Sequence, residues 1–194
     1  AFHIAYKTGK IDESMLRRLL SSLIRLPDMI SGILKQAPEI SLLAQRYAYL
    51  DHAYFIGRNL DYAVALEASL KLKEISYIHS EAYAAGELKH GTISLIEEGT
   101  FVVALACCDR LFEKTASNIK EVKARGAEVL LVTTENRKDD FPEADHIICI
   151  PQTDELLLPS VEIIPMQLLG YYIALARKCD IDKPRNLAKS VTVE

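Results

Sequence analysis

The chain has 194 residues, and 49% of them are hydrophobic, which is enough for one buried core in one domain with a helical extension. Its net charge of -4 forms no basic stripe, so nucleic acid is not an expected partner. No run approaches the ~18 apolar residues that span a bilayer, so we expect no membrane partner either.

The four cysteines show neither a Cys-x-x-Cys pair nor a neighbouring histidine in metal-ligand spacing. They are therefore expected to be reduced structural thiols of a cytoplasmic protein: Cys107, Cys108, Cys149 and Cys179. The chain starts at Ala1, without Met or a signal-peptide pattern, which indicates a fragment of a longer protein.

The first quarter of the chain predicts helices. Residues 12–36 form one or two amphipathic helices, with Asp12 as N-cap and Pro27 as the expected restart point. The apolar positions recur at helical spacing: Leu16, Leu19, Leu20, Leu23 and Ile24. A second, shorter helical pattern covers 39–49.

The remainder alternates between strands and helices. Apolar runs predict strands at 53–57, 101–106, 128–134 and 146–150, and helices are expected at 60–79, 109–125 and 160–177. Continuous apolar strands separated by helices indicate an α/β fold with a doubly wound parallel sheet covered on both faces. In such folds, ligands bind beyond the carboxyl ends of the strands.

Three ionisable residues share one face of the expected helix at 60–79. Glu67, Lys71 and Glu74 fall within roughly 60° of one another on a helical wheel. The same sector holds apolar residues and should face the core: Ala63, Leu70 and Ile78. The polar face, on the opposite side, holds Tyr62, Ser69 and Lys73. Two interpretations stay open, a buried ion-pair network and a catalytic carboxylate tuned by a lysine.

His90 stands directly before Gly91, where a turn could bring its ring to a cleft. A lone histidine is more often structural than catalytic, so the residue pattern leaves both roles open.

Two stretches resemble the signature of the glucosamine-6-phosphate synthase family: ALEASLKLKEISYIHSEAYAAGELKHG (65–91) and DKPRNLAKSVTVE (182–194). The resemblance covers essentially the whole chain. It implies a sugar isomerase (SIS) domain, a flavodoxin-like three-layer α/β/α fold with about five strands. It also implies a helical linker from a missing first SIS domain at 1–49, the second SIS domain at 50–181 and a C-terminal active-site tail at 182–194.

Members of that family convert fructose 6-phosphate to glucosamine 6-phosphate with ammonia from a glutaminase domain. By resemblance, Glu74 moves the proton between C1 and C2 of the sugar, and Lys71 is its catalytic neighbour. Glu67 belongs to the same cluster as a substrate-binding residue. The chemistry requires a positioned carboxylate and no metal or organic cofactor.

The resemblance also assigns ring-opening residues. His90 is implied to reach the active site of the neighbouring subunit in a homodimer. Lys189 corresponds to a tail lysine that closes over the substrate, with Ala188 offering a backbone contact. The loop that binds the sugar phosphate belongs to the first SIS domain, and Thr92 stands where the family commonly has proline.

Two alternatives remain: another SIS phosphosugar isomerase or deglycase, and a non-catalytic module that binds a sugar phosphate. The tail at 182–194 is the feature that favours the aminotransferase, because neither alternative is expected to carry all of it. A fragment without the phosphate-binding loop is expected to be inactive alone.

Overall fold

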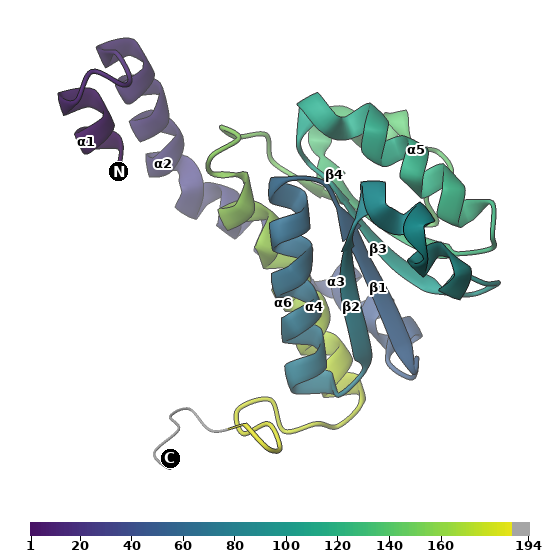
Figure 1. Ribbon diagram of the computed structural model, residues 1–194. Helices are drawn as coiled ribbons and strands as arrows, with labels where there is room; N and C mark the ends of the chain where they lie inside the picture. The colour runs from purple at the N-terminus through teal and green to yellow at the C-terminus, as the bar shows by residue number, and fades with distance from the viewer. Residues whose placement is uncertain (188–194) are drawn as a thin grey trace, which may run out of the picture.

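A five-stranded parallel sheet between two helical layers forms the body of the protein, in a computed structural model that describes residues 1–187 (Figure 1). The strand order is β2-β1-β3-β4-β5, and every neighbouring pair is parallel. The strands are β1 (His52–Gly57), β2 (His79–Ala84), β3 (Phe101–Ala106), β4 (Glu128–Thr134) and β5 (His146–Ile150). The expected α/β fold class is confirmed.

The helices divide between the two faces of this sheet. One face is covered by α3 (Ala37–Tyr47), α4 (Leu60–Ser76) and α6 (Leu158–Ala176), and the other by α5 (Phe112–Lys123) with the short helix η1 (Ala85–His90). There are three further short helices: η2 (Thr92–Leu95) follows η1, η3 (Asp109–Leu111) precedes α5, and η4 (Glu135–Asp140) follows β4. The three-layer arrangement follows from strands that are apolar on both faces.

The N-terminal helices α1 (Phe2–Lys7) and α2 (Glu13–Leu34) project from the body as an arm (Figure 1). Asp12 caps α2 as expected, because its carboxylate accepts the backbone N–H of Met15 at 2.7 Å. The expected restart at Pro27 is wrong, since α2 continues through it. Pro27 and Leu23, four residues earlier, are both exposed, so the carbonyl that loses its helical partner can bind water.

Two elements differ from the sequence expectation. Strand β2 was not expected from the residues 79–84, because only Ser80 is buried in this edge strand and its pattern is therefore mostly polar. Helix α4 ends at Ser76 rather than at 79, where Tyr77 takes a left-handed conformation with φ +63°. The remaining predicted strands and helices are present, with ends that differ by a few residues.

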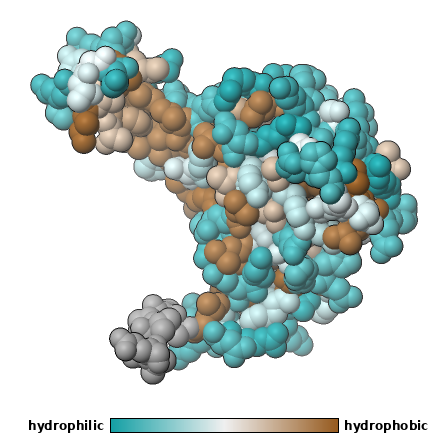
Figure 2. Space-filling model, in the orientation of Figure 1, coloured by the Kyte–Doolittle hydropathy of each residue, from teal (hydrophilic) through white to brown (hydrophobic). Residues whose placement is uncertain are grey.

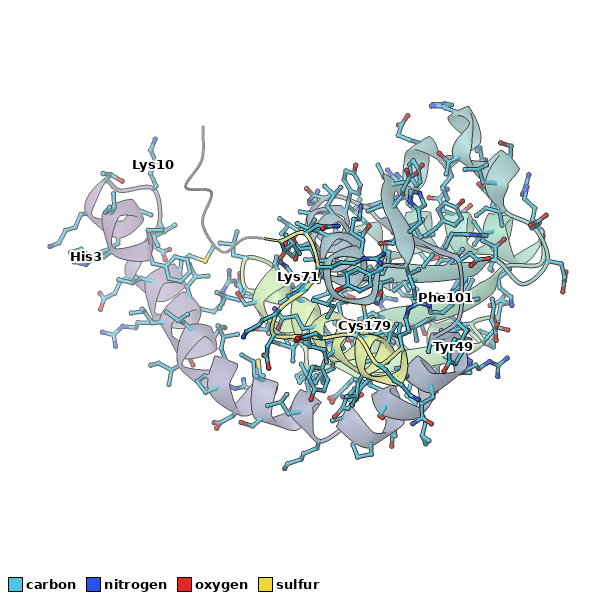
Figure 3. The ribbon with its side chains drawn as sticks, turned by 90° about the horizontal axis from the view of Figure 1, so that it is seen from below. His3, Lys10, Tyr49, Lys71, Phe101 and Cys179 are labelled. Carbon is cyan, nitrogen blue, oxygen red and sulfur yellow. The ribbon has the colours of Figure 1, made fainter. Side chains whose placement is uncertain are left out.

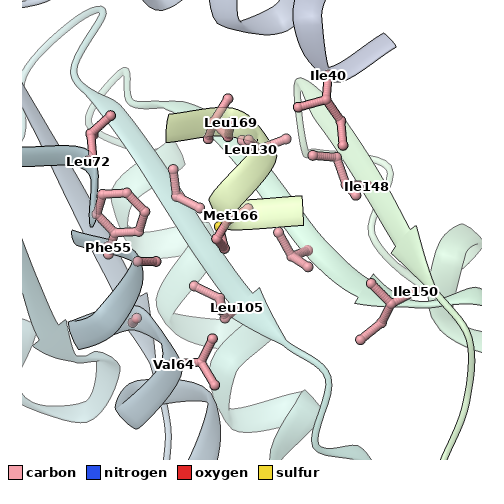
Figure 4. Packing of buried hydrophobic residues seen from close by; sticks show 14 of the residues in the cluster. Ile40, Phe55, Val64, Leu72, Leu105, Leu130, Ile148, Ile150, Met166 and Leu169 are labelled. Carbon is pink, nitrogen blue, oxygen red and sulfur yellow. The ribbon is translucent and has the colours of Figure 1, made fainter. Parts of the chain in front are cut away.

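The larger core lies under α4 and α6 (Figure 4). Phe55 and Leu105 from the sheet meet Leu72 from α4 and Met166 from α6 there. Helix α3 contributes to the same core through Ile40, so part of the expected 1–49 linker belongs to the covering layer of the sheet. The division of the chain at 49 and 181 stays a prediction.

Helix α6 is long and apolar enough to cross a membrane by length and composition alone. In the folded chain it lies against α3 and α4 on the sheet, and half of its apolar stretch is buried inside the protein. It therefore serves as the central core helix of this face.

Two carboxyl groups are fully buried where α4 and α6 begin. Asp61 accepts the backbone N–H groups of Cys107 and Cys108 at 3.2 and 3.3 Å. Neither carboxyl oxygen of Glu162 has a hydrogen-bond partner within residues 1–187. Burial raises the pKa of Asp61 to about 7 and raises the pKa of Glu162 well above its usual range, and the negative charge of Asp61 raises the pKa of Glu162 further.

This pair should make stability depend on pH. Above about pH 4, unfolded carboxyls release protons that the folded protein retains, so the free energy of unfolding falls as the pH rises toward 7. Replacing Glu162→Gln removes one buried charge. We expect it to raise Tm at pH 8 by roughly 2–4 °C, or about 1 kcal/mol, and to change Tm little at pH 5.

Thermal unfolding followed by circular dichroism at both pH values measures this difference. Glu113→Gln, an exposed position on α5, is the matched control and should show no pH-dependent change. An equal effect of Glu162→Gln at pH 5 and pH 8 would contradict the assignment of a buried ionisable pair.

Candidate active site

Helix α4 carries a row of three charged side chains on its outer face. The Lys71 ammonium donates to the Glu74 carboxylate at 2.7 Å, and it lies 3.7 Å from the Glu67 carboxylate. Spacings of three and four residues place these groups one above the other along the helix. Glu74 is the least exposed of the three, with 25% of its side chain accessible against 37% for Lys71 and 47% for Glu67.

The electrostatics of the row are dominated by the lysine between two acids. The hydrogen bond that Lys71 donates to Glu74 raises the pKa of Lys71, and the negative charges of Glu74 and Glu67 add to that effect. Lys71 therefore stays cationic at neutral pH, and its ammonium group holds the Glu74 carboxylate in a fixed position. In this arrangement Lys71 cannot serve as a base, whereas Glu74 can.

The pair faces an open cavity of about 1100 Å³. The opposite wall of the cavity comes from the segment that follows α6, with Ile181, Asp182, Lys183, Pro184 and Leu187. Figure 3 shows Lys71 beside this yellow C-terminal segment. Residues separated by about 110 positions in the sequence thus form one site.

The charged row does not face the core, so this part of the sequence interpretation is wrong. Leu70, expected in the core-facing sector, is 41% exposed, whereas Ser69, expected on the polar face, is 2% exposed. The reason is steric: the small side chains Ala65, Ala68 and Ser69 allow α4 to approach β2 and α6 closely, so they face inward. A buried ion-pair network is therefore excluded as the explanation of the row.

His90 lies at the other end of β2 from this row. Helix α4 ends beside the start of β2, and η1, which ends at His90, follows the last residue of β2. A strand of six residues spans ~16 Å. The His90 ring is exposed, and its Nδ1 lies 2.7 Å from the Glu87 carboxylate. Within one chain the structure does not bring His90 and Glu74 together.

Lys189 and Ala188 fall outside the described residues, so their expected roles stay predictions. Within residues 1–187, no three histidine, cysteine, aspartate or glutamate side chains are grouped closely enough to hold a metal ion. The expectation that no cofactor is needed also stays a prediction.

The sequence pattern does not single out Tyr77 or Arg185. The hydroxyl of Tyr77 accepts the backbone N–H of Arg185 at 2.9 Å, which joins the end of α4 to the segment that lines the cavity. A helix that ends on a left-handed residue usually has glycine or asparagine there, so the sequence gives no signal for Tyr77 at this position. Nothing in the sequence pairs it with Arg185.

The carboxyl end of the sheet, where ligands of doubly wound folds usually bind, holds the buried Asp61 and Glu162 instead of the charged row. The Lys71–Glu74 pair lies on the last turns of α4, near the amino ends of the strands. The cavity therefore does not lie where the fold class predicts a ligand site, beyond the carboxyl ends of the strands.

Comparisons with known proteins agree with this fold. The family model of the SIS domain matches residues 47–177. Two relatives named glutamine–fructose-6-phosphate aminotransferase [isomerizing] match all 194 residues: one from Symbiobacterium thermophilum at 53% identity and one from Caldanaerobacter subterraneus subsp. tengcongensis at 50%. The chain spans 32% of the length of each.

A solved structure shows the same fold. The C-terminal domain of glucosamine-fructose-6-phosphate aminotransferase from Francisella tularensis superimposes with a TM-score of 0.89 at 34% identity. The match covers 94% of this chain and 51% of that one. With its match to the family model over most of its length, the chain belongs to the SIS domain family and is a relative of the glutamine–fructose-6-phosphate aminotransferases.

Proposed function

We propose that this chain is the C-terminal part of an isomerising glutamine–fructose-6-phosphate aminotransferase, and that Glu74 is its proton-transfer residue. The observation that carries the proposal is the Lys71–Glu74 pair, 2.7 Å apart, facing a cavity that the C-terminal segment closes on one side. Relatives of that name match the whole chain at about 50% identity.

The proposed reaction needs one base that serves two adjacent carbons. Ammonia adds to the C2 ketone of fructose 6-phosphate, and the ketone oxygen leaves as water to give an imine at C2. Glu74 removes a proton from C1, the electron pair forms the C1=C2 bond, and the imine nitrogen gains a proton. Glu74 then delivers its proton to C2, and loss of the C1 hydroxyl proton leaves the aldehyde of glucosamine 6-phosphate.

The other two members of the row support this step. Lys71 holds the Glu74 carboxylate, so the base stays in one place while the proton moves. Glu67, one turn away, keeps Lys71 cationic and is exposed enough to contact a sugar hydroxyl. Both roles need only side chains of this chain.

A first SIS domain is proposed to complete the site by supplying the phosphate-binding loop. Figure 2 shows a concave side between the N-terminal arm and the C-terminal segment, with hydrophobic patches along it. Large apolar side chains are exposed on α4 and on α2: Leu66, Leu70, Leu20, Leu23 and Ile24. Exposed apolar surface of this kind is typical of a protein–protein interface. About two thirds of the length of each relative lies outside the part that this chain matches.

The enzyme is further proposed to be a cytoplasmic homodimer in which His90 opens the sugar ring in the partner's site. The separation of His90 and Glu74 along β2 supports this, because one chain cannot direct both at the same sugar. The four cysteines are free thiols, which fits a reducing compartment. Glutamine-derived ammonia would come from a glutaminase domain outside this chain.

Glu74→Gln in the full-length protein should lower product formation by roughly 10²–10⁴-fold, since glutamine cannot accept a proton. Binding of fructose 6-phosphate, measured by isothermal titration, should change little. Glu113→Gln, an exposed acid on α5, serves as the control and should keep full activity. Normal turnover by the Glu74 variant would remove the basis for the proposed function.

Subunit mixing tests whether His90 acts on the neighbouring site. Inactive Glu74→Gln and His90→Ala proteins are mixed and allowed to exchange subunits. If His90 acts across the interface, half of the sites in each mixed dimer combine an intact Glu74 with an intact His90. Random exchange should then restore about a quarter of wild-type activity. If the mixtures stay inactive although subunit exchange is demonstrated, His90 does not act in the active site of the neighbouring subunit.

Lys189→Ala should impair ring opening more than isomerisation. We expect kcat/KM to fall by roughly tenfold or more for fructose 6-phosphate. The decrease should be smaller for an analogue that lacks the C5 hydroxyl and so cannot close the furanose ring. The ratio of the two values is the measurement, and equal losses on both substrates would argue against a ring-opening role.

A further inference from the structure

The C-terminal segment turns back onto the end of α4 after α6. Its turn is shaped by Asp180, whose carboxylate accepts the backbone N–H groups of Asp182 and Lys183 at 3.1 and 2.9 Å. The residues after this turn line the cavity opposite Lys71 and Glu74. The position of this segment therefore decides the shape of the site.

Tyr77 holds this segment by two contacts with one residue. Its hydroxyl accepts the backbone N–H of Arg185 at 2.9 Å, and the Arg185 guanidinium lies 4.0 Å from the centre of the Tyr77 ring. The first contact places the backbone and the second places the side chain. Together they restrict the segment more than either does alone.

The backbone of Tyr77 makes a tyrosine an unexpected choice at this position. With φ +63° and ψ +13°, Tyr77 is the left-handed residue that ends α4, where glycine carries no steric penalty. The turn itself does not use the Tyr77 side chain. It is supported by the hydroxyl of Ser76, which donates to the Leu72 carbonyl at 2.6 Å and accepts the Ile78 N–H at 3.3 Å.

We propose that Tyr77 is a positioning residue that seats the C-terminal segment over the Lys71–Glu74 pair through Arg185. The inference rests on the proposed function and extends it to a residue outside the charged row. Lys189 follows Arg185 by four positions, so the Cα atoms of the two residues lie within ~14 Å of each other. Anchoring Arg185 thereby limits where Lys189 can act.

Tryptic cleavage of the full-length protein after Arg185 tests the contact without any substrate. The Arg185 side chain must leave the Tyr77 ring before trypsin can bind this side chain. Tyr77→Gly should therefore speed cleavage by roughly fivefold or more, and Tyr77→Phe, which keeps the ring, by less. An unchanged cleavage rate in Tyr77→Gly would overturn the inference, whatever the activity of the enzyme.

The kinetic test compares two substrates in the same variants. Tyr77→Gly should lower kcat/KM for fructose 6-phosphate by about tenfold, and less for the analogue without the C5 hydroxyl, because the loss concerns ring opening. Its Tm should not fall, since glycine relieves the left-handed tyrosine. A merely structural role would instead lower Tm and affect both substrates equally, and that result would overturn the proposal.

Lys178→Gly is the matched control. Lys178 follows α6 in the same left-handed conformation, with φ +59°, and its side chain is exposed. Lys178→Gly should leave both the cleavage rate after Arg185 and the enzyme activity unchanged. Faster cleavage and a lower kcat/KM, as expected for Tyr77→Gly, would overturn the proposal. Failure of the proposed function itself would appear separately, as normal turnover by Glu74→Gln, while cleavage after Arg185 would still decide the Tyr77 contact.

Discussion

The close packing of α4 against β2 and α6 is the constraint on which the candidate site depends. The Ser80 hydroxyl donates to the Ser69 carbonyl at 2.7 Å, so helix and strand are nearly in contact. On the other side, Gly170 of α6 approaches Leu72 of α4 without a side chain between them. These contacts fix the rotation of α4, and the rotation decides that Glu67, Lys71 and Glu74 point outward rather than into the core.

The same packing separates Glu74 from His90 within one chain. Helix α4 runs antiparallel to β2, so its last turns lie at the opposite end of the strand from η1. The residues that we propose for proton transfer and for ring opening, Glu74 and His90, therefore lie at two ends of one domain. A symmetric partner can bring the two ends together, because in a twofold dimer each end can meet the other subunit. The exposed leucines lie beside the row, on the side where we propose that another domain completes the site.

The ionisable side chains of this domain lie in two different environments. Asp61 and Glu162 are buried between the helices, away from the cavity, and their raised pKa values make them sensitive to pH as structural groups. Lys71 and Glu74 are partly exposed at the cavity, where their ion pair remains accessible to a small molecule. The depth of burial, rather than the residue type, separates a structural carboxyl from a candidate catalytic one.

Apolar runs and helical periodicity are local properties, so the α/β class, most of the strands and the spacing of Glu67, Lys71 and Glu74 can be predicted from the sequence alone. The buried face of α4 cannot be predicted in this way, because the helix has apolar residues on both sides. Its small side chains are the buried ones, since they allow close packing against β2 and α6. Strand β2, at the edge of the sheet, was missed for a similar reason, because half-exposed residues show no apolar run. The pairing of Tyr77 with Arg185, 108 residues later, was decided only by the tertiary structure, which brings together groups that no local pattern connects.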